Sequence, residues 1–504
     1  MTPSPAQRDS RDITRGAGFN YLGFAARLGS RAPFLVLAGL LYGEAVFGRY
    51  TFALAVIETA AALSLFGVKR SMLKFMSRAQ ATGGSLPQAI GNAVALPIIA
   101  AMVMTVAVAG GAAELATLFN SPSVAEALLL LAPAIPLIVT ADVLLAAIRF
   151  TRDMRPEVLS RSVAEPLTLT LVLVAAYLGG VRETGLFVAY LASVAMAAGG
   201  AVFFFVRRFP VRECLAVRLH WRDMRELVGY SGPTAFFDLL ILLSNRVDVY
   251  LVTFFFPDAV LGVYGMAWQF SSFVKKIRAG FDPIVAPVVS QSLADGDVAR
   301  AEGQLAMVSR WVLTVQVPVV LAFAFLGDEL LGLMGGGFAG GALILTILVL
   351  GDMINGTAGF SEYPFLFERP AANVGFGALQ LSANVALGIV LIGFLGPEGA
   401  ALGVLGSYAL VNAIRLVALS RAFGIGMLRA AMVKPLVAGA VAGGVLWVLD
   451  RLLPGEVVVR VAASMGAMVA AYVLVLVGLG LEREERELVG GWKGRRKGEG
   501  GRVG

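Results

Sequence analysis

Ionisable side chains interrupt several long apolar runs of this 504-residue sequence. A charge at the centre of a helix in lipid costs about 2.5–3.5 kcal/mol, so such residues usually face a helix-bundle interior or a wet cavity. Lys275, Arg278 and Asp282 follow an i, i+3, i+7 spacing, which places them on one face of a helix, and Lys276 lies beside them. This cluster indicates a buried site that handles charge.

The basic residues among these ionisable side chains favour an anionic ligand. Arg27 and Arg31 share a face of the first apolar run, and arginine can hold phosphate oxygens through two parallel hydrogen bonds. Arg246 and Asp248 lie two apart, about 200° around a helix, so they should serve different places. The residues predicted to line a cationic, substrate-binding cavity are Arg31, Lys275, Arg27, Lys276, Arg246 and Arg278. The alternative is snorkelling, in which these side chains reach the membrane surface.

Acidic residues within the apolar runs are candidates for coupling transport to an ion or a proton. They are Asp248, Glu58, Asp142, Glu165, Asp352 and Glu362. Each has a plainer alternative as the partner of a nearby arginine, and Arg415 is a basic residue that could pair with one of them.

Helices that cross a membrane must position these residues. The chain is 58% hydrophobic and 15% charged, against about 25% charge in soluble domains, and many apolar runs are long enough to span about 30 Å of hydrocarbon. The sequence therefore predicts an all-α polytopic membrane protein of about fourteen spans. They are 18–43, 48–68, 88–111, 125–149, 159–180, 184–206, 229–255, 259–284, 306–327, 339–361, 373–395, 398–420, 429–450 and 457–480.

Basic residues in the connections predict the orientation of these spans. Thirty lie on one side and four on the other, and the basic side of a membrane protein is the cytoplasmic one. Both termini are then cytoplasmic. The net charge of +7 reflects this orientation, and we expect no nucleic-acid partner.

A short repeat predicts that the spans form two similar lobes. Glu44–Tyr50 reads EAVFGRY and Asp258–Tyr264 reads DAVLGVY, and each copy lies between two apolar runs, 214 positions apart. Since each lobe has six spans, the lobes should be parallel and related by a pseudo-two-fold axis along the membrane normal. The predicted divisions are a cytoplasmic tail (1–17), the N-lobe (18–206), a linker (207–228), the C-lobe (229–420), a helix pair (421–481) and a basic cytoplasmic tail (482–504).

The residues that remain argue against catalysis. The one cysteine, Cys214, and the one histidine, His220, lie in the same connection, so we expect no metal site, no cofactor and no catalytic residue. The predicted outer loops are short, whereas a membrane-embedded polysaccharide polymerase or ligase needs catalytic groups there. The sequence also lacks the G-x-x-x-x-G-K-[ST] loop that binds ATP phosphates.

Three segments resemble bacterial oligosaccharide and polysaccharide flippases, the O-antigen flippase-like family of the multidrug/oligosaccharidyl-lipid/polysaccharide exporter superfamily. The run 42–78, with its Gly-x-Tyr and basic end, is similar to their second span. The run 245–267 places Asp248 on a recurrent aspartate, and 381–403 places Asn384 and the Gly399-Ala400-Ala401 turn on pattern. The segment Pro364–Pro370 departs from the pattern.

The resemblance implies alternating access, in which two lobes rock about a central cavity. It implies a polyprenyl-pyrophosphate-linked oligosaccharide as cargo, membrane lipids around the chain, a bacterial inner-membrane location, and work beside a polysaccharide polymerase and a chain-length regulator. Coupling to H⁺ or Na⁺ remains open. Two alternatives are a related transporter, either a cation-coupled multidrug exporter or a peptidoglycan-precursor flippase, and a membrane-embedded polymerase or ligase.

Overall fold

The computed structural model describes the backbone of residues 5–480 except 82, 84, 120, 152, 216–224, 226–234, 237 and 453–456. It describes side chains from residue 32 to 480, except at those positions and at 69–71, 73, 74, 457 and 458. Within these ranges every regular element is a helix, so the prediction of an all-α polytopic membrane protein is confirmed.

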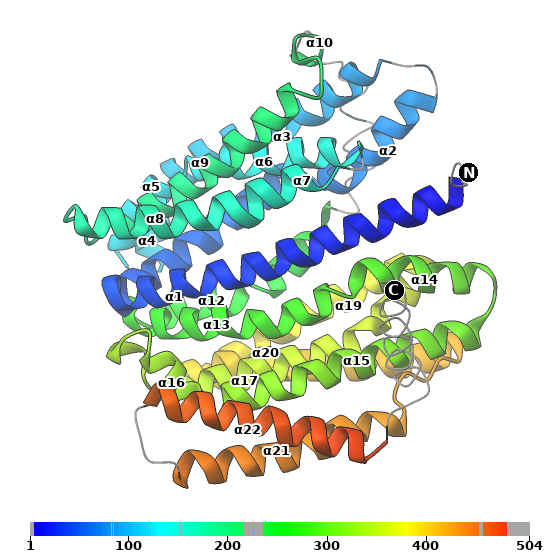
Figure 1. The fold of residues 1–504 in the computed structure, drawn as a ribbon. Coiled ribbons are helices and arrows are strands. Elements are labelled where there is room, and N and C mark those ends of the chain that lie inside the picture. The colour runs from blue at the N-terminus through cyan, green and yellow to red at the C-terminus, as the bar shows by residue number, and fades with distance from the viewer. Residues whose placement is uncertain are drawn as a thin grey trace, which may run out of the picture.

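The first half of the chain forms one group of helices, drawn in blue to green in Figure 1. They are α1 (Pro5–Leu65), α2 (Val68–Ala81), α3 (Leu86–Gly110), α4 (Ala112–Leu118), α5 (Ser123–Leu131), α6 (Ala134–Arg149), α7 (Arg155–Glu157), the π-helix η1 (Val158–Ala164), α8 (Glu165–Leu178), α9 (Gly185–Val206) and α10 (Val211–Leu215). Here α6 packs on α3 and α9, and α8 packs on α9.

The second half forms another group, and a final helix pair packs on its far side (Figure 1). The helices of this half are α12 (Val247–Phe255), α13 (Asp258–Ala279), α14 (Asp282–Ala294), α15 (Val298–Phe325), α16 (Gly327–Gly332), η2 (Gly336–Phe338), α17 (Ala342–Ala358), η3 (Gly359–Ser361), α18 (Glu362–Glu368), α19 (Pro370–Leu395) and α20 (Pro397–Phe423). The pair, which follows η4 (Ala430–Met432), is α21 (Val433–Leu452) and α22 (Val457–Gly478).

Eleven helices of the described chain are long and apolar enough to cross a membrane. The difference from fourteen has three sources. The first two predicted spans are separate helical stretches that meet at a kink at Gly43, where φ is +74° and ψ is 177°, and α1 contains both of them, so the prediction of two spans here is not contradicted. The seventh predicted span contains residues outside the described ranges. The eighth, α13, has 22 residues but is too polar, because it carries Gln269 and three basic residues. The count of fourteen and the side on which the termini lie stay predictions, as do the domain boundaries.

The two halves meet where α1 crosses α13, and the repeat lies at this crossing. A Cβ on Gly48 would run into the carbonyl of Asp258, and a Cβ on Gly262 would run into the carbonyl of Glu44. Gly262 lies 214 positions after Gly48, and Asp258 lies 214 positions after Glu44, so the repeat offset converts each of these two contacts into the other. Contacts across a two-fold axis have this property. These contacts support a two-fold relation between the two halves at this crossing, while the six-span composition and the parallel orientation of the lobes stay predictions.

Two further contacts between the halves are related by the same offset of 214 residues. The carboxylate of Asp258 accepts hydrogen bonds from Ser121 (2.9 Å) and Ser123 (3.0 Å) of the first half. The carboxylate of Glu44 lies against Gly337, the residue 214 positions after Ser123. Both acids of the repeat therefore tie one half to an outer loop of the other.

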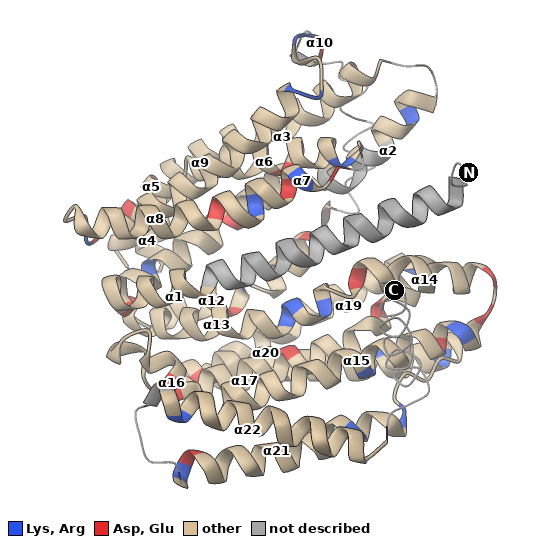
Figure 2. Cartoon of the chain, in the orientation of Figure 1, with Lys and Arg blue, Asp and Glu red and all other residues tan. Residues whose placement is uncertain are grey.

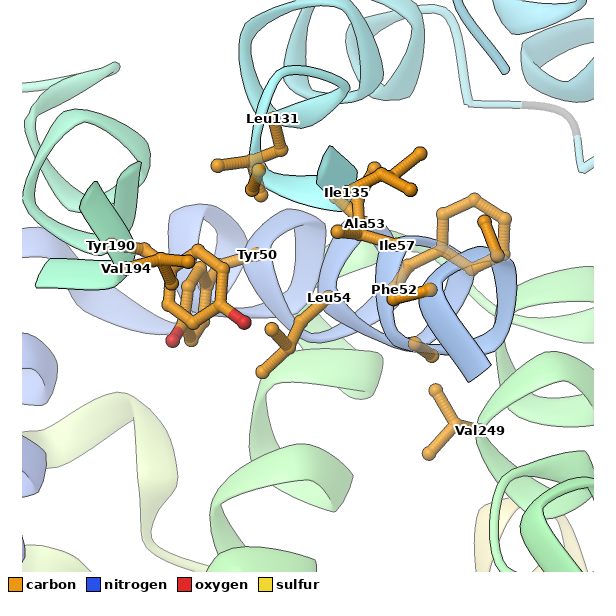
Figure 3. Close-up of a cluster of buried hydrophobic side chains, with 14 of the residues drawn as sticks. Tyr50, Phe52, Ala53, Leu54, Ile57, Leu131, Ile135, Tyr190, Val194 and Val249 are labelled. Atoms are coloured by element: carbon orange, nitrogen blue, oxygen red, sulfur yellow. The ribbon is translucent and has the colours of Figure 1, made fainter. Parts of the chain in front are cut away.

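Apolar side chains around α1 form a core shared by both halves (Figure 3). Tyr50 packs edge-on against Tyr190 of α9, with ring centroids 5.8 Å apart. Leu54 and Ile57 are buried, and Val249 of α12 approaches the opposite side of the same helix (Figure 3). The core holds α1 as the central element of the molecule.

Candidate functional site

A cavity of about 580 Å³ opens beside α1, between α6, η1, α8 and α9 of the first half and the α13–α14 junction of the second. Along α1 its lining includes Phe34 and runs from Tyr50 to Leu65, and along α13 it reaches Ala279. It therefore lies on the side of the α1–α13 crossing that the sequence predicts to be cytoplasmic, and the crossing closes it toward the other side. Both halves line it, and a volume of this size suits a small ligand or the head group of a larger one.

Charge is concentrated in the lining of this cavity. In Figure 2 charged residues interrupt the tan helices around the start of α8. The charged lining residues within the described chain are Glu58, Asp142, Arg149, Glu157, Arg161 and Glu165. Among these described residues acids outnumber arginines by four to two, while Arg27 and Arg31 of the predicted cationic cavity lie outside the described side chains.

Arg161 is the centre of the strongest cluster in the cavity. Its guanidinium donates to Asp142 Oδ1 (2.6 Å) and to Glu165 Oε2 (3.1 Å), and it reaches the carbonyl of Ile138 (3.4 Å). All three charged side chains are less than one fifth exposed. Arg161 lies in η1, and π-helical turns of this kind are frequent at functional sites because they redirect a side chain.

We expect Arg161→Gln to lower the stability of the protein by about 3–5 kcal/mol, because Asp142 and Glu165 would stay buried without their shared cation. The measurement is thermal unfolding in detergent. The matched control is Arg161→Gln with Asp142→Asn and Glu165→Gln, which removes all three charges and should recover most of the loss. A triple variant as unstable as the single one would show that the ion pairs are not the cause.

A second charged contact links the two halves at the edge of the cavity. Arg246, which precedes α12, forms an ion pair with Glu58 of α1. The guanidinium carbon of Arg246 lies 4.3 Å from the ring centroid of Trp268 on α13. Nearby, the hydroxyls of Tyr250 and Thr59 are 2.8 Å apart. These contacts make the α1–α12 interface polar at the depth of the cavity.

Lys275 lies on the other side of Trp268, in a polar cluster of the second half. Its ammonium is 3.4 Å from Asp352 of α17 and 3.4 Å from the side-chain oxygen of Asn245, which also accepts from Tyr408 (3.2 Å). Asp352 is almost fully buried, while about a quarter of the Lys275 side chain is accessible. Lys275 therefore neutralises Asp352, and it is not among the described residues that line the cavity.

Asp248 and Asp352 each keep a buried oxygen without a hydrogen-bond partner in the structure. The other oxygen of Asp248 accepts from Tyr264 at 2.9 Å. Asp248 thus contacts Tyr264 of α13, whereas Arg246 contacts both Glu58 of α1 and Trp268 of α13. Two buried carboxylates near one lysine leave an excess of negative charge in this cluster.

Arg278 is enclosed by acids away from the cavity lining. It pairs with Glu362 of α18 and lies 3.6 Å from Asp282, and Arg415 of α20 lies 3.9 Å from the same Glu362. The expected pairing of Arg415 with one of the intramembrane acids is confirmed. Lys276 lies over the ring of Phe273, 5.1 Å from its centroid. The geometry gives Arg278 and Glu362 a structural role first.

The structure thus brings the predicted residues together as separate groups. Arg246 and Glu58 meet across the halves, Lys275 and Asp352 meet within the second half, and Asp142 and Glu165 share a cation that sequence reasoning counted among the loop residues. The clue to Arg161 was present, since it precedes Glu165 by four residues inside the predicted span 159–180. Arg27 and Arg31 lie outside the residues whose side chains are described.

Comparison with known proteins supports a transporter fold. Residues 32–292, just over half of the chain, match a family described as "polysaccharide biosynthesis protein". Among curated proteins none matches the sequence.

Solved structures of similar fold cover most of the chain at low identity. The lipid II flippase MurJ in an inward closed conformation has a TM-score of 0.70 at 12% identity. The alignment covers 90% of this chain and 98% of the MurJ chain. An inward-facing multidrug resistance MATE family transporter of the MOP superfamily has a TM-score of 0.64 at 12% identity. The alignment covers 79% of this chain and 94% of the transporter. The MATE multidrug transporter DinF-BH has a TM-score of 0.56 at 15% identity, covering 83% and 97%.

Proposed function

Because the chain belongs to the polysaccharide biosynthesis protein family, we propose that it flips a polyprenyl-pyrophosphate-linked oligosaccharide across the bacterial inner membrane for the synthesis of a surface polysaccharide. The two halves rock about the α1–α13 crossing, so that the cavity faces one side of the membrane and then the other. The polyprenyl tail stays in the lipid beside the lobes. A polysaccharide polymerase and a chain-length regulator are the proposed protein partners.

The observation that carries this proposal is the cavity itself. It is lined from both halves, contains charged side chains at the depth of the membrane, and is closed at one end by a contact between the halves. A rigid enzyme site does not need a closure at the pseudo-two-fold axis, whereas alternating access does. The pyrophosphate is the group that the arginines of the site would hold, as guanidinium groups bind phosphate oxygens bidentately.

Ion coupling is the role we propose for the acids of both halves. Asp142 and Glu165 line the cavity, and Asp248 and Asp352 each have a buried oxygen without a hydrogen-bond partner, which a proton or Na⁺ would satisfy. Glu58 links this region to Arg246, and Glu362 to Arg278. The proposal leaves the choice between H⁺ and Na⁺ to experiment.

A second candidate function is a cation-coupled multidrug exporter. It is favoured by the acidic excess of the cavity lining, since a cationic drug would be attracted to Glu58 and Glu157. The flippase function is preferred because each arginine of the cavity lining can exchange a carboxylate for a phosphate. A peptidoglycan-precursor flippase would use the same chemistry on a different sugar.

The test is deletion of the gene, followed by analysis of lipids and of cell-surface sugar. We expect surface polysaccharide to disappear and a polyprenyl-pyrophosphate oligosaccharide to accumulate on the cytoplasmic face, as shown by its protection from enzymes added to intact spheroplasts. Complementation with the intact gene is the control. Normal polysaccharide together with hypersensitivity to cationic drugs would instead establish the exporter, and accumulation of the peptidoglycan precursor would establish the third alternative.

A further inference from the structure

A second hollow lies on the outside of the bundle, near the predicted cytoplasmic ends of α19 and α20. It has a volume of about 660 Å³. Its apolar wall includes Ile414 and Val417, whose side chains are 40% and 51% exposed. In a helix that crosses the membrane, such side chains face lipid tails.

Two arginines stand at the end of this apolar wall. Arg369 caps the start of α19, and Arg421 lies in the last turn of α20. Because the two helices run in opposite directions, both guanidinium groups fall at the same end of the bundle, which the basic connections place on the cytoplasmic side. Both side chains are exposed.

The described lining of this groove contains two arginines, five apolar residues and no acid. Glu368 is next to Arg369 in the chain but is not part of the lining. Arg415, which lies in α20 like Arg421, is turned inward, where it is buried and pairs with Glu362. The groove therefore has a positive end and an apolar length.

Aromatic packing holds the groove in shape. Phe365 of α18 lies between Phe376 and Phe423, at ring distances of 5.0 and 5.3 Å, and so separates the ends of α19 and α20. The guanidinium of Arg369 rests over the Phe423 ring at 5.3 Å. Farther along, the two helices touch closely, since a Cβ on Gly403 would be 2.7 Å from the Cα of Gly388.

We propose that this groove binds an anionic phospholipid of the surrounding membrane, with its phosphate on Arg369 and Arg421 and an acyl chain along Ile414 and Val417. An anionic phospholipid fits the groove in charge and in position. Its phosphate lies at the membrane interface, where the two arginines are, and its acyl chain lies in the hydrocarbon, where the apolar wall is. The site is separate from the transport cavity and does not depend on which cargo that cavity takes.

The test uses the full-length protein in detergent, titrated with phosphatidylglycerol or with phosphatidylcholine of the same acyl chains, and follows thermal stability and bound lipid in native mass spectra. One basic residue near an anionic surface contributes about 1 kcal/mol, or about fivefold. We therefore expect a preference of about 30-fold for phosphatidylglycerol, falling to about onefold in Arg369→Gln/Arg421→Gln.

Arg300→Gln is the matched control, because Arg300 is an exposed arginine at the start of α15, outside the groove; it should keep the full preference. Each single variant should keep about fivefold, and these serve if the double variant does not fold. Equal affinity for the two lipids in the unaltered protein, or a full preference in the double variant, would overturn the proposal.

Discussion

Replacing Lys275 with glutamine is expected to reduce surface polysaccharide at least about tenfold while the protein remains in the membrane. A hydrogen bond to a charged group contributes about 1.5–3 kcal/mol, which corresponds to roughly 10- to 100-fold in the binding of an anionic head group. Lys275 is the basic residue of the second-half cluster whose side chain is partly accessible while its partner, Asp352, is buried. The measurement is the amount of surface polysaccharide, with the protein level followed by immunoblot.

A double variant separates a role in substrate binding from a purely structural one. Lys275→Gln leaves Asp352 as an unpaired buried acid, whereas Lys275→Gln/Asp352→Asn leaves a neutral pair. If Lys275 contacts the cargo, the double variant will be as stable as the original protein but will still fail to export. Restored export in the double variant would mean that Lys275 serves only to neutralise Asp352.

Gly262→Val is expected to stop transport by preventing closure at the α1–α13 crossing. A Cβ at this position would collide with the backbone carbonyl of Glu44, which a rotamer change cannot relieve. Overpacking costs about 1–3 kcal/mol, enough to shift a closed-to-open equilibrium by roughly 5- to 150-fold. Since Cys214 is the single cysteine of the sequence, Cys214→Ser/Thr51→Cys gives a reporter beneath the crossing, where Thr51 packs on Gly265.

Labelling of that reporter by a membrane-impermeant maleimide should rise about tenfold with Gly262→Val. Gly199→Val is the control, because a Cβ there meets no atom within 4 Å although the residue also lies in a long helix. Gly48→Val should reproduce the Gly262→Val effect, since the two glycines have equivalent contacts. Unchanged labelling and normal export in both crossing variants would remove the crossing from the transport mechanism.

The features that sequence reasoning predicted well depend on local patterns or on charge. Apolar length predicted the helices, and the seven-residue repeat predicted two similar halves. Gly439 and Gly443 have the G-x-x-x-G spacing that is typical of close helix contact, and they pack α21 on Val317, Leu321 and Phe325 of α15.

The charge pairing could not be predicted, because it depends on which helices become neighbours. Asp142 and Arg161 are 19 residues apart, and Arg246 and Glu58 are 188 apart, so spacing along the chain says nothing of their contact. The π-helical turn that aims Arg161 into the cavity has no sequence signature. Spacing on one helix face correctly grouped Arg278 with Asp282. It could not predict the ion pair between Arg278 and Glu362, which lies 84 residues away and gives Arg278 its structural role.

The crossing of α1 and α13 also bears on the origin of the chain. Glu44 contacts Gly262, Gly48 contacts Asp258 and Thr51 contacts Gly265. Adding or subtracting 214 exchanges the first two contacts and returns the third to itself, so the surface is complementary to itself. An ancestor with a single set of six helices already had what it needed to assemble as a homodimer through this surface. Fusion of two such genes would have preserved the dimer contact and allowed the two copies to diverge, so that the first half now pairs Arg161 with Asp142 and the second pairs Lys275 with Asp352.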